Sequence, residues 1–174
     1  MNLIKVLTVT SLLVLGVTAQ TKTKAKTKPI VRTNATTSVK PTFTREKFDP
    51  KRDPTADLAS ATLLAKSSGK NIIIDVGGEW CGWCVYVDRF FFDNRSIAKL
   101  RDDNYVWLKV NMGPENENKA FLSAYPEISG YPHLFVLDSD GILLQSQSTD
   151  VLEAGKGYDL AKFTEFLQKW VPKP

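Results

Sequence analysis

The two cysteines of this chain, Cys81 and Cys84, stand three positions apart in the stretch IIIDVGGEWCGWCVYV. A cysteine pair at this spacing is compatible with half of a metal site, with a small structural disulfide, or with a redox-active dithiol. The residues that accompany the pair, and the elements that hold it, decide among these three kinds of chemistry.

A metal site lacks ligands in this sequence. Tetrahedral zinc takes four, usually two cysteine pairs or one pair with histidines, and the chain adds only a single distant histidine, His133. We therefore expect no metal and no other cofactor. A structural disulfide across so short a loop would remove little entropy from the unfolded chain. That interpretation stays open, but it is weaker than a redox role.

Cys81 falls where a buried strand meets a helix. The run NIIIDV (71–76) is apolar and β-branched, which is typical of a strand buried on both faces. After the turn GGEW, we predict a helix that begins at the cysteines and runs to about Phe92. The free N–H groups of a helix N-terminus stabilise an anion, so this position favours a Cys81 thiolate. Cys84, one turn later, can resolve a mixed disulfide formed by Cys81.

The remaining pattern predicts alternating helices and strands in the order α-β-α-β-α-β-β-α. A first helix should begin after the N-cap Asp53 and end before Gly69, and a last helix should follow the N-cap Asp159. The apolar stripe of that last helix is predicted to be Leu160, Phe163, Leu167 and Trp170. Between them we expect helices over 96–101 and 117–125 and strands over 105–112, 133–138 and 142–147.

The stretch IDVGGEWCGWC resembles the active-site strand and motif of the thioredoxin superfamily, in particular of its exported disulfide-reductase type domains. The resemblance implies an α/β thioredoxin fold, with a central mixed β-sheet flanked by helices. It also implies a redox disulfide between Cys81 and Cys84, and a buried Asp75 that relays a proton to and from Cys84. The stretch LKVNM resembles the family strand whose lysine lies near that acid, which makes Lys109 a candidate charge partner of Asp75.

A second stretch, SGYPHLFVLDSDG (129–141), resembles the family's cis-proline turn. The resemblance implies that Pro132 is cis and packs against the cysteines, and that Tyr131 offers backbone groups to a substrate strand. His133 has two interpretations, a stabiliser of the Cys81 thiolate or a residue at a strand start that makes a surface hydrogen bond. The tryptophans of the motif could form an apolar surface for substrates; of these, we expect Trp80 to pack on the fold and Trp83 to be exposed.

The N-terminal part of the chain differs in composition from the rest. Residues 1–19 have a lysine, an apolar run of about 12 residues and a small-residue cleavage pattern, which predicts a signal peptide. An uncleaved membrane anchor is the alternative, but the apolar run is short for a bilayer. Residues 20–47 are Lys/Thr-rich and predicted to be a disordered linker, and residues 48–174 are predicted to form the thioredoxin-like domain.

The basic pI near 9.0 does not describe the predicted domain. Seven of the 23 Lys and Arg residues, and no acidic residue, lie within residues 1–41, which leaves 16 basic against 19 acidic residues and a net charge of −3 in the rest. We therefore expect no nucleic-acid partner. The basic linker has two interpretations, a spacer or a segment that is weakly attracted to an anionic surface.

These features predict an exported, periplasmic or secreted, thiol–disulfide oxidoreductase that is soluble after signal cleavage and monomeric. We expect it to act as a reductase or isomerase on disulfide-containing exported proteins, and to exchange electrons with a membrane or soluble redox partner. Cytosolic thioredoxins have Gly-Pro between the cysteines, where this chain has Gly82-Trp83. The alternative is a thioredoxin-like binding module whose cysteines are not catalytic.

Overall fold

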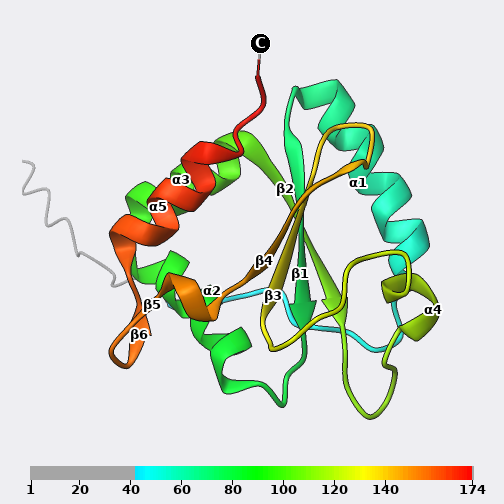
Figure 1. Cartoon of the computed structure of the whole chain (residues 1–174), viewed down its shortest axis with the longest axis horizontal. Helices are drawn as coiled ribbons and strands as arrows, with labels where there is room; N and C mark the ends of the chain where they lie inside the picture. The colour runs from blue at the N-terminus through cyan, green and yellow to red at the C-terminus, as the bar shows by residue number, and fades with distance from the viewer. Residues whose placement is uncertain (1–41, 174) are drawn as a thin grey trace, which may run out of the picture. The chain divides into compact units, whose positions relative to one another are not determined.

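The structure of the chain is a computed structural model that describes residues 42–173 (Figure 1). The predicted signal peptide and residues 20–41 of the predicted linker lie outside the described residues. Within residues 42–173, no helix has both the length and the apolar character needed to cross a membrane.

A four-stranded sheet forms the centre of the fold, with the strand order β2-β1-β3-β4. The strands are β1 (Asn71–Gly77), β2 (Tyr105–Asn111), β3 (His133–Leu137) and β4 (Leu143–Ser148). β1 and β2 are parallel, whereas β3 is antiparallel to both β1 and β4. Every residue of β1 and β3 is buried, as expected for the two central strands of a sheet covered on both faces.

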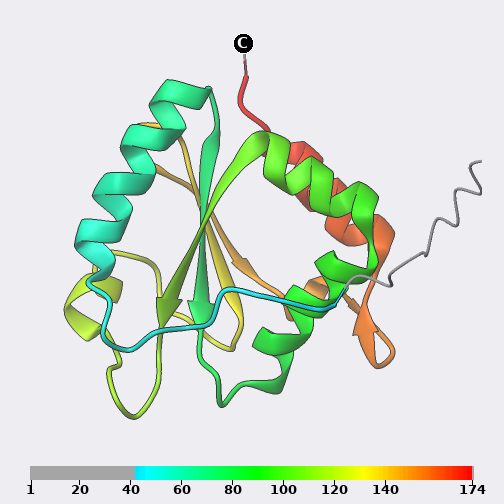
Figure 2. The ribbon, with the colours of Figure 1, turned by 180° about the vertical axis from the view of Figure 1, so that it is seen from behind.

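Helices cover both faces of this sheet (Figures 1 and 2). On one face lie α1 (Pro54–Ser68) and the short α4 (Lys119–Leu122); on the other lie α2 (Gly82–Asp93), α3 (Arg95–Asn104) and α5 (Leu160–Lys169). A mixed sheet between two layers of helices confirms the predicted α/β thioredoxin fold.

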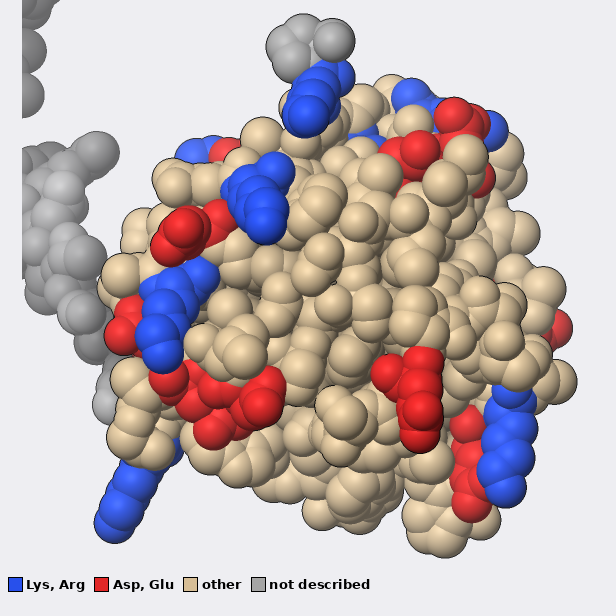
Figure 3. Space-filling view, in the orientation of Figure 1, with Lys and Arg blue, Asp and Glu red and all other residues tan. Residues whose placement is uncertain are grey.

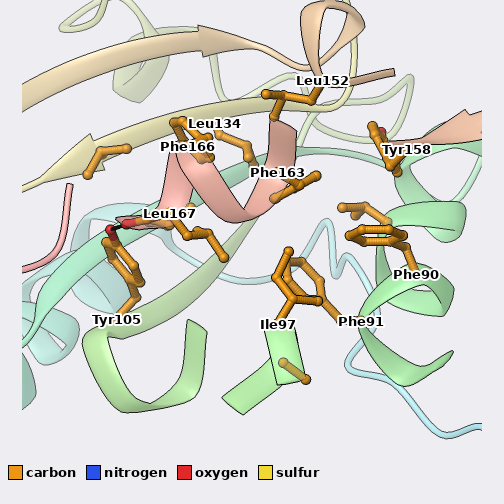
Figure 4. Packing of buried hydrophobic residues seen from close by; sticks show 14 residues of the cluster. Phe90, Phe91, Ile97, Tyr105, Leu134, Leu152, Tyr158, Phe163, Phe166 and Leu167 are labelled. Atoms are coloured by element: carbon orange, nitrogen blue, oxygen red, sulfur yellow. Dashed lines mark hydrogen bonds between the residues drawn. The ribbon is translucent and has the colours of Figure 1, made fainter. Parts of the chain in front are cut away.

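The larger part of the core lies between the sheet and the helices α2, α3 and α5 (Figure 4). Phe90 and Phe91 of α2 meet Phe163 of α5 with ring centroids 5.3 Å apart in each pair. Burying one such side chain contributes about 1.5–3 kcal/mol. The hydroxyl of Tyr105, at the start of β2, donates a hydrogen bond to the backbone oxygen of Leu167, which ties the sheet to α5. This layer holds α2 rigidly against β1.

The predicted helix caps are confirmed. The Asp53 side chain accepts a hydrogen bond from the Thr55 N–H, and the Asp159 side chain accepts two at the start of α5. Gly69 ends α1 with a φ of +67°, a conformation that glycine adopts without strain. The stripe predicted for α5 is partly wrong, because Leu160 is 44% exposed while Phe166 is buried in its place.

Three other segments differ from their predicted structure. The helix predicted over 117–125 is reduced to α4, which follows Asn118 in a left-handed conformation with a φ of 48°. α3 is longer than the predicted 96–101. A 3-10 turn, η1 (Asp150–Leu152), and a small hairpin of β5 (Glu153–Ala154) and β6 (Gly157–Tyr158) were not predicted. Two-residue strands are too short to show a periodic pattern in sequence.

Residues 42–53, here called the strap, run from the side of α2 across β2 and β1 to the start of α1 (Figure 2, cyan). Phe43 packs edge-on against Phe92 of α2, at a centroid distance of 5.2 Å. Phe48 is 3% exposed. Contacts of the domain therefore begin before the predicted boundary at Phe48, because residues 42–47 already bind to α2.

Charged side chains of both signs are interspersed over the face drawn in Figure 3, with uncharged surface between them. Among the described residues, several surface charges are paired with a neighbour, such as Arg89 with Asp93 and Lys66 with Asp140. On the face shown, the basic side chains do not merge into one continuous basic area.

Candidate active site

The cysteine pair lies at the junction of β1 and α2. Cys81 is the N-cap of α2 and forms a disulfide with Cys84, with 5.2 Å between their Cα atoms. The backbone N–H of Cys84 donates a hydrogen bond to the sulfur of Cys81, at 3.1 Å. In a reduced protein this N–H and the helix N-terminus would stabilise a thiolate at Cys81. Cys81 is 6% exposed and Cys84 fully buried, so Cys81 is the sulfur nearer to solvent.

Gly77, the last residue of β1, makes room for the buried cysteine. A Cβ atom at this position would lie 2.5 Å from the sulfur of Cys84 and 3.1 Å from the ring of Phe48. Phe48 of the strap packs with Cys81 and Cys84 in a small apolar cluster. The absence of a side chain at Gly77 thus lets the helix, the strand and the strap meet at the disulfide.

Asp75 is fully buried two residues before Gly77 on β1. Alternate residues of a strand face the same side, so Asp75 points to the face on which Gly77 meets Cys84. Its Oδ2 atom accepts hydrogen bonds from Lys109 Nζ, at 2.8 Å, and from Trp107 Nε1, at 3.2 Å. Its Oδ1 atom has no hydrogen-bond partner among residues 42–173. Asp75 therefore keeps one buried oxygen that is available to accept a hydrogen bond.

Lys109 lies directly across from Asp75 in the parallel pairing of β1 and β2. The structure therefore brings together the two residues that the sequence suggested as charge partners. Lys109 is 7% exposed, and burial alone would lower its pKa. Its contacts with Asp75 and Asp88 outweigh burial and raise the pKa of Lys109, so the ammonium stays charged.

Asp88 is a member of the site that sequence reasoning missed. It lies on α2, four residues after Cys84, and its Oδ1 atom is 2.9 Å from Lys109 Nζ. Burial raises the pKa of Asp88, an effect that Lys109 only partly offsets. The available signal was its helical spacing, because residues four apart on a helix share a face. The buried carboxylate of Asp75 and the partly buried carboxylate of Asp88 thus share one ammonium beside the disulfide.

On the opposite side of the cysteines lies the predicted proline turn. The Tyr131–Pro132 peptide bond is cis, and the Pro132 carbonyl accepts a hydrogen bond from the hydroxyl of Thr149, at 2.8 Å. Tyr131 packs against the apolar cluster of the cysteines and edge-on against Trp80, at a centroid distance of 5.7 Å. The structure brings Tyr131, Trp80 and the disulfide to one surface.

The exposure expected for the two tryptophans is wrong. Trp80 is 56% exposed, although its indole N–H donates to the backbone oxygen of Met112, at 2.7 Å. Trp83 is half-buried, because its ring packs on Tyr86 and on Tyr158 of β6. The unpredicted hairpin supplies one of these partners, which explains why the sequence did not show that Trp83 would be covered.

His133 does not face the acid of the site. It shares the side of β3 with Phe135, which packs under α1, whereas Asp75 lies on the other face of the sheet. The His133 ring makes a hydrogen bond to the Ser146 hydroxyl, at 2.8 Å, and burial lowers its pKa. These contacts favour the second interpretation, a strand residue with a hydrogen bond, although the side chain is buried.

No group of three His, Cys, Asp or Glu residues in the described part of the chain is arranged to hold a metal ion. The chemistry that the site offers is that of two sulfur atoms, a buried and a partly buried carboxylate, and one ammonium. Such a set can form and break a disulfide and can move a proton to and from the buried thiol.

Comparison with known proteins agrees with this geometry. A sequence profile described as thioredoxin-like matches residues 53–139, half of the chain. The chain belongs to the thioredoxin-like family. Over 95 residues, 54% of this chain, it is 27% identical to the thiol:disulfide interchange protein DsbD of Colwellia psychrerythraea. That region is 16% of the relative's length, so the two proteins share one part only.

Solved structures show the same fold. A disulphide isomerase from Xylella fastidiosa superposes with a TM-score of 0.60 and 22% identity, covering 70% of this chain and 94% of its own. The oxidised C-terminal domain of DsbD from Neisseria meningitidis superposes with a TM-score of 0.51 and 22% identity, covering 72% and 99%. This thioredoxin-like chain therefore has its fold in common with both.

Proposed function

We propose that this protein is a thiol–disulfide oxidoreductase that exchanges disulfides with exported proteins, as a reductase or an isomerase. The observation that carries the proposal is the Cys81–Cys84 disulfide at the N-terminus of α2, on the sheet face that bears the buried Asp75 and Lys109. The relatives named as thiol:disulfide interchange protein and disulphide isomerase support the same reaction class.

In the reducing direction, the Cys81 thiolate of the reduced protein attacks one sulfur of a substrate disulfide. A mixed disulfide forms, and the first substrate sulfur leaves as a thiolate. Asp75 then takes the proton of the Cys84 thiol, and the Cys84 thiolate attacks the Cys81 sulfur. The second substrate thiolate leaves, two electrons have passed to the substrate, and the enzyme is left with its own disulfide.

The structure is in this disulfide state, so a further cycle of reduction needs a dithiol donor that returns two electrons. We infer that a membrane or soluble redox partner supplies them. In isomerisation the mixed disulfide would instead be attacked by another substrate thiol, which releases Cys81 without net electron transfer.

Substrate would bind over the surface of Trp80 and Tyr131, next to the less buried Cys81. Exposed aromatic side chains beside a reactive group are typical binding anchors. The backbone of Tyr131, just before β3, is the proposed partner of an extended substrate segment.

Trapping of intermediates tests the proposal. The Cys84→Ser variant should accumulate mixed disulfides through Cys81, whereas Cys81→Ser should accumulate none, and the unchanged protein should reduce insulin with a dithiol as donor. Absence of both adducts and insulin reduction would favour the binding module, which would still capture partners through Trp80 without a covalent link.

Export is part of the proposal and rests on residues 1–19, outside the described part of the chain. The expected signal cleavage after Ala19 gives a mature protein that begins at Gln20. N-terminal sequencing of protein recovered from its native host tests this directly. A recovered chain that still begins at Met1 would contradict export by signal cleavage.

A further inference from the structure

The strap brings a partly buried cation to the candidate active site. Arg45 has a side chain that is 13% exposed and lies against two acids of the site. One of its guanidinium nitrogens is 2.9 Å from Glu79 Oε1 and 3.3 Å from Asp88 Oδ2, and its other terminal nitrogen binds Glu79 Oε2. Glu79 precedes Cys81 by two residues, and Asp88 follows Cys84 by one turn.

This contact completes an alternating row of charges that runs beside the disulfide. In order, the row consists of Glu79, Arg45, Asp88, Lys109 and Asp75. It holds three acids and two bases, so its formal charge is −1 when all are ionised. Removal of Arg45 would leave three acids and one base around the cysteines, with a formal charge of −2.

The strap is also held in place by the same acid. Glu79 Oε1 accepts a hydrogen bond from the backbone N–H of Phe48, at 3.0 Å, in addition to its bond from Arg45. Phe48 packs on both cysteines and lies under the Lys109 ammonium, which is 4.2 Å from its ring centroid. Glu79 therefore fixes both the charged and the apolar contact of the strap with the site.

We propose that Arg45 is a positioning residue of the active site, which holds Glu79 and Asp88 in place and offsets their charge, and so stabilises the Cys81 thiolate of the reduced protein. The inference rests on the proposed function, because it assigns Arg45 a part in the same thiol chemistry. An uncompensated negative charge beside a thiol disfavours its ionisation. Without Arg45, Asp88 would also compete more strongly with Asp75 for Lys109.

Other charged side chains lie near Arg45 and contribute to the electrostatic potential at the row of charges. A cavity of about 300 Å³ is lined by Arg45, Asp88 and Lys109 together with the charged residues Glu46, Arg95, Arg101 and Asp102. Of these, Arg101 binds the exposed carboxylate of Asp102. The cavity opens the row of charges to solvent on a side that neither cysteine lines, so ions and protons can reach it there.

The test measures the alkylation rate of Cys81 by iodoacetamide as a function of pH, on the full reduced chain. We expect Arg45→Met to raise the pKa of the Cys81 thiol and to lower its alkylation rate at pH 7 by about three- to tenfold. Arg45→Lys should restore most of the rate. Arg52→Met is the matched control, because Arg52 lies in the same strap but pairs with Asp57, at 2.6 Å, on the surface.

A double variant separates charge from structure. Arg45→Met combined with Asp88→Asn returns the formal charge of the row to −1, so its alkylation profile should move back towards that of the unchanged protein. The proposal is overturned if folded Arg45→Met keeps the unchanged profile, if Arg52→Met shifts it equally, or if the double variant stays as slow as Arg45→Met. Should Arg45→Met not fold, Arg45→Gln takes its place in every comparison, because the glutamine amide can donate to Glu79 but carries no charge.

Alkylation needs no protein substrate, so its outcome is independent of the proposed function. Insulin reduction by the unchanged protein tests that function separately. If the unchanged protein reduces insulin but Arg45→Met does not shift the alkylation profile, only the proposed role of Arg45 is overturned. If Arg45→Met shifts the profile but the unchanged protein does not reduce insulin, only the proposed oxidoreductase function is overturned.

Discussion

Asp75 is the site residue whose predicted burial and predicted charge partner both agree with the structure. The resemblance of its stretch to the active-site strand of the thioredoxin superfamily implied a buried acid, and the structure places Asp75 fully buried opposite Lys109. Asp88 could not be found in the same way, since its importance depends on which face of α2 meets β2. Sequence gives a helix and its period, but not the rotation of that helix against a neighbouring strand.

Replacing the carboxylate of Asp75 tests its proposed proton transfer. In Asp75→Asn the Cys84 thiol loses its acceptor, so we expect insulin reduction at pH 7 to slow by about 10²-fold while the mixed disulfide through Cys81 accumulates. Asp103→Asn is the control, because Asp103 is exposed and pairs only with Lys99. An unchanged rate of resolution in Asp75→Asn would remove this acid from the mechanism.

A methyl group at Gly77 tests the close packing around the disulfide. The new Cβ would lie 2.5 Å from the Cys84 sulfur, so the helix or the strap must shift, and we expect Gly77→Ala to lower the free energy of unfolding by about 1–3 kcal/mol. Gly130→Ala has no atom within 4 Å of its new Cβ and should change stability little. Urea denaturation of the oxidised proteins measures both, and equal midpoints would contradict the tight contact.

Among the helices and strands, the sequence predicted those whose caps or apolar pattern lie within the element itself. α1 has both of its caps in the sequence, and β1 is a β-branched apolar stretch interrupted by Asp75, so both were placed within one residue. α4 and the β5–β6 hairpin are too short for a period, and tertiary contacts decide them instead. The strap was assigned to the linker up to residue 47, because its few anchors, Phe43 and Arg45, form no pattern of their own.

The N-cap of α5 offers a test of an element on which the core depends. The Asp159 side chain accepts hydrogen bonds from the N–H groups of Ala161 and Lys162, at 2.8 and 3.0 Å. Asp159→Ala leaves these donors without their acceptor and should lower the free energy of unfolding by about 0.5–2 kcal/mol. Asp159→Asn keeps an acceptor oxygen and should stay close to the unchanged protein in the same urea titration. A loss of stability as large in Asn as in Ala would contradict the cap.

At the scale of the whole molecule, the charge of the chain is divided between its parts. The residues after 41 carry a net charge of −3 although the calculated pI of the full sequence is about 9.0. Sequence alone showed this division, but it could not show that three acids and two bases of the domain meet beside the disulfide. That arrangement depends on the contacts of Asp88 with both Arg45 and Lys109, residues far apart in the sequence that only the folded chain brings together.

His133 makes the stability of the whole molecule depend on pH. It is the only histidine of the chain and is 3% exposed, and burial lowers its pKa below the ordinary value of 6.5, with Asp150 offsetting this in part. Between that folded pKa and 6.5, the unfolded chain binds a proton that the folded protein does not. The free energy of unfolding contributed by His133 is therefore fully present above pH 6.5 and is lost as the pH falls through this window.

The comparison of the unchanged protein with His133→Gln isolates this effect from the titration of the carboxylates. We expect the unchanged protein to lose more of its free energy of unfolding between pH 7.5 and about 5 than the variant does, since glutamine keeps a polar group near Ser146 but does not titrate. The single imidazole resonance in a proton NMR titration gives the pKa directly. The prediction is contradicted if the pKa of His133 lies at or above 6.5. It is also contradicted if the free energy of unfolding changes with pH in parallel for the two proteins.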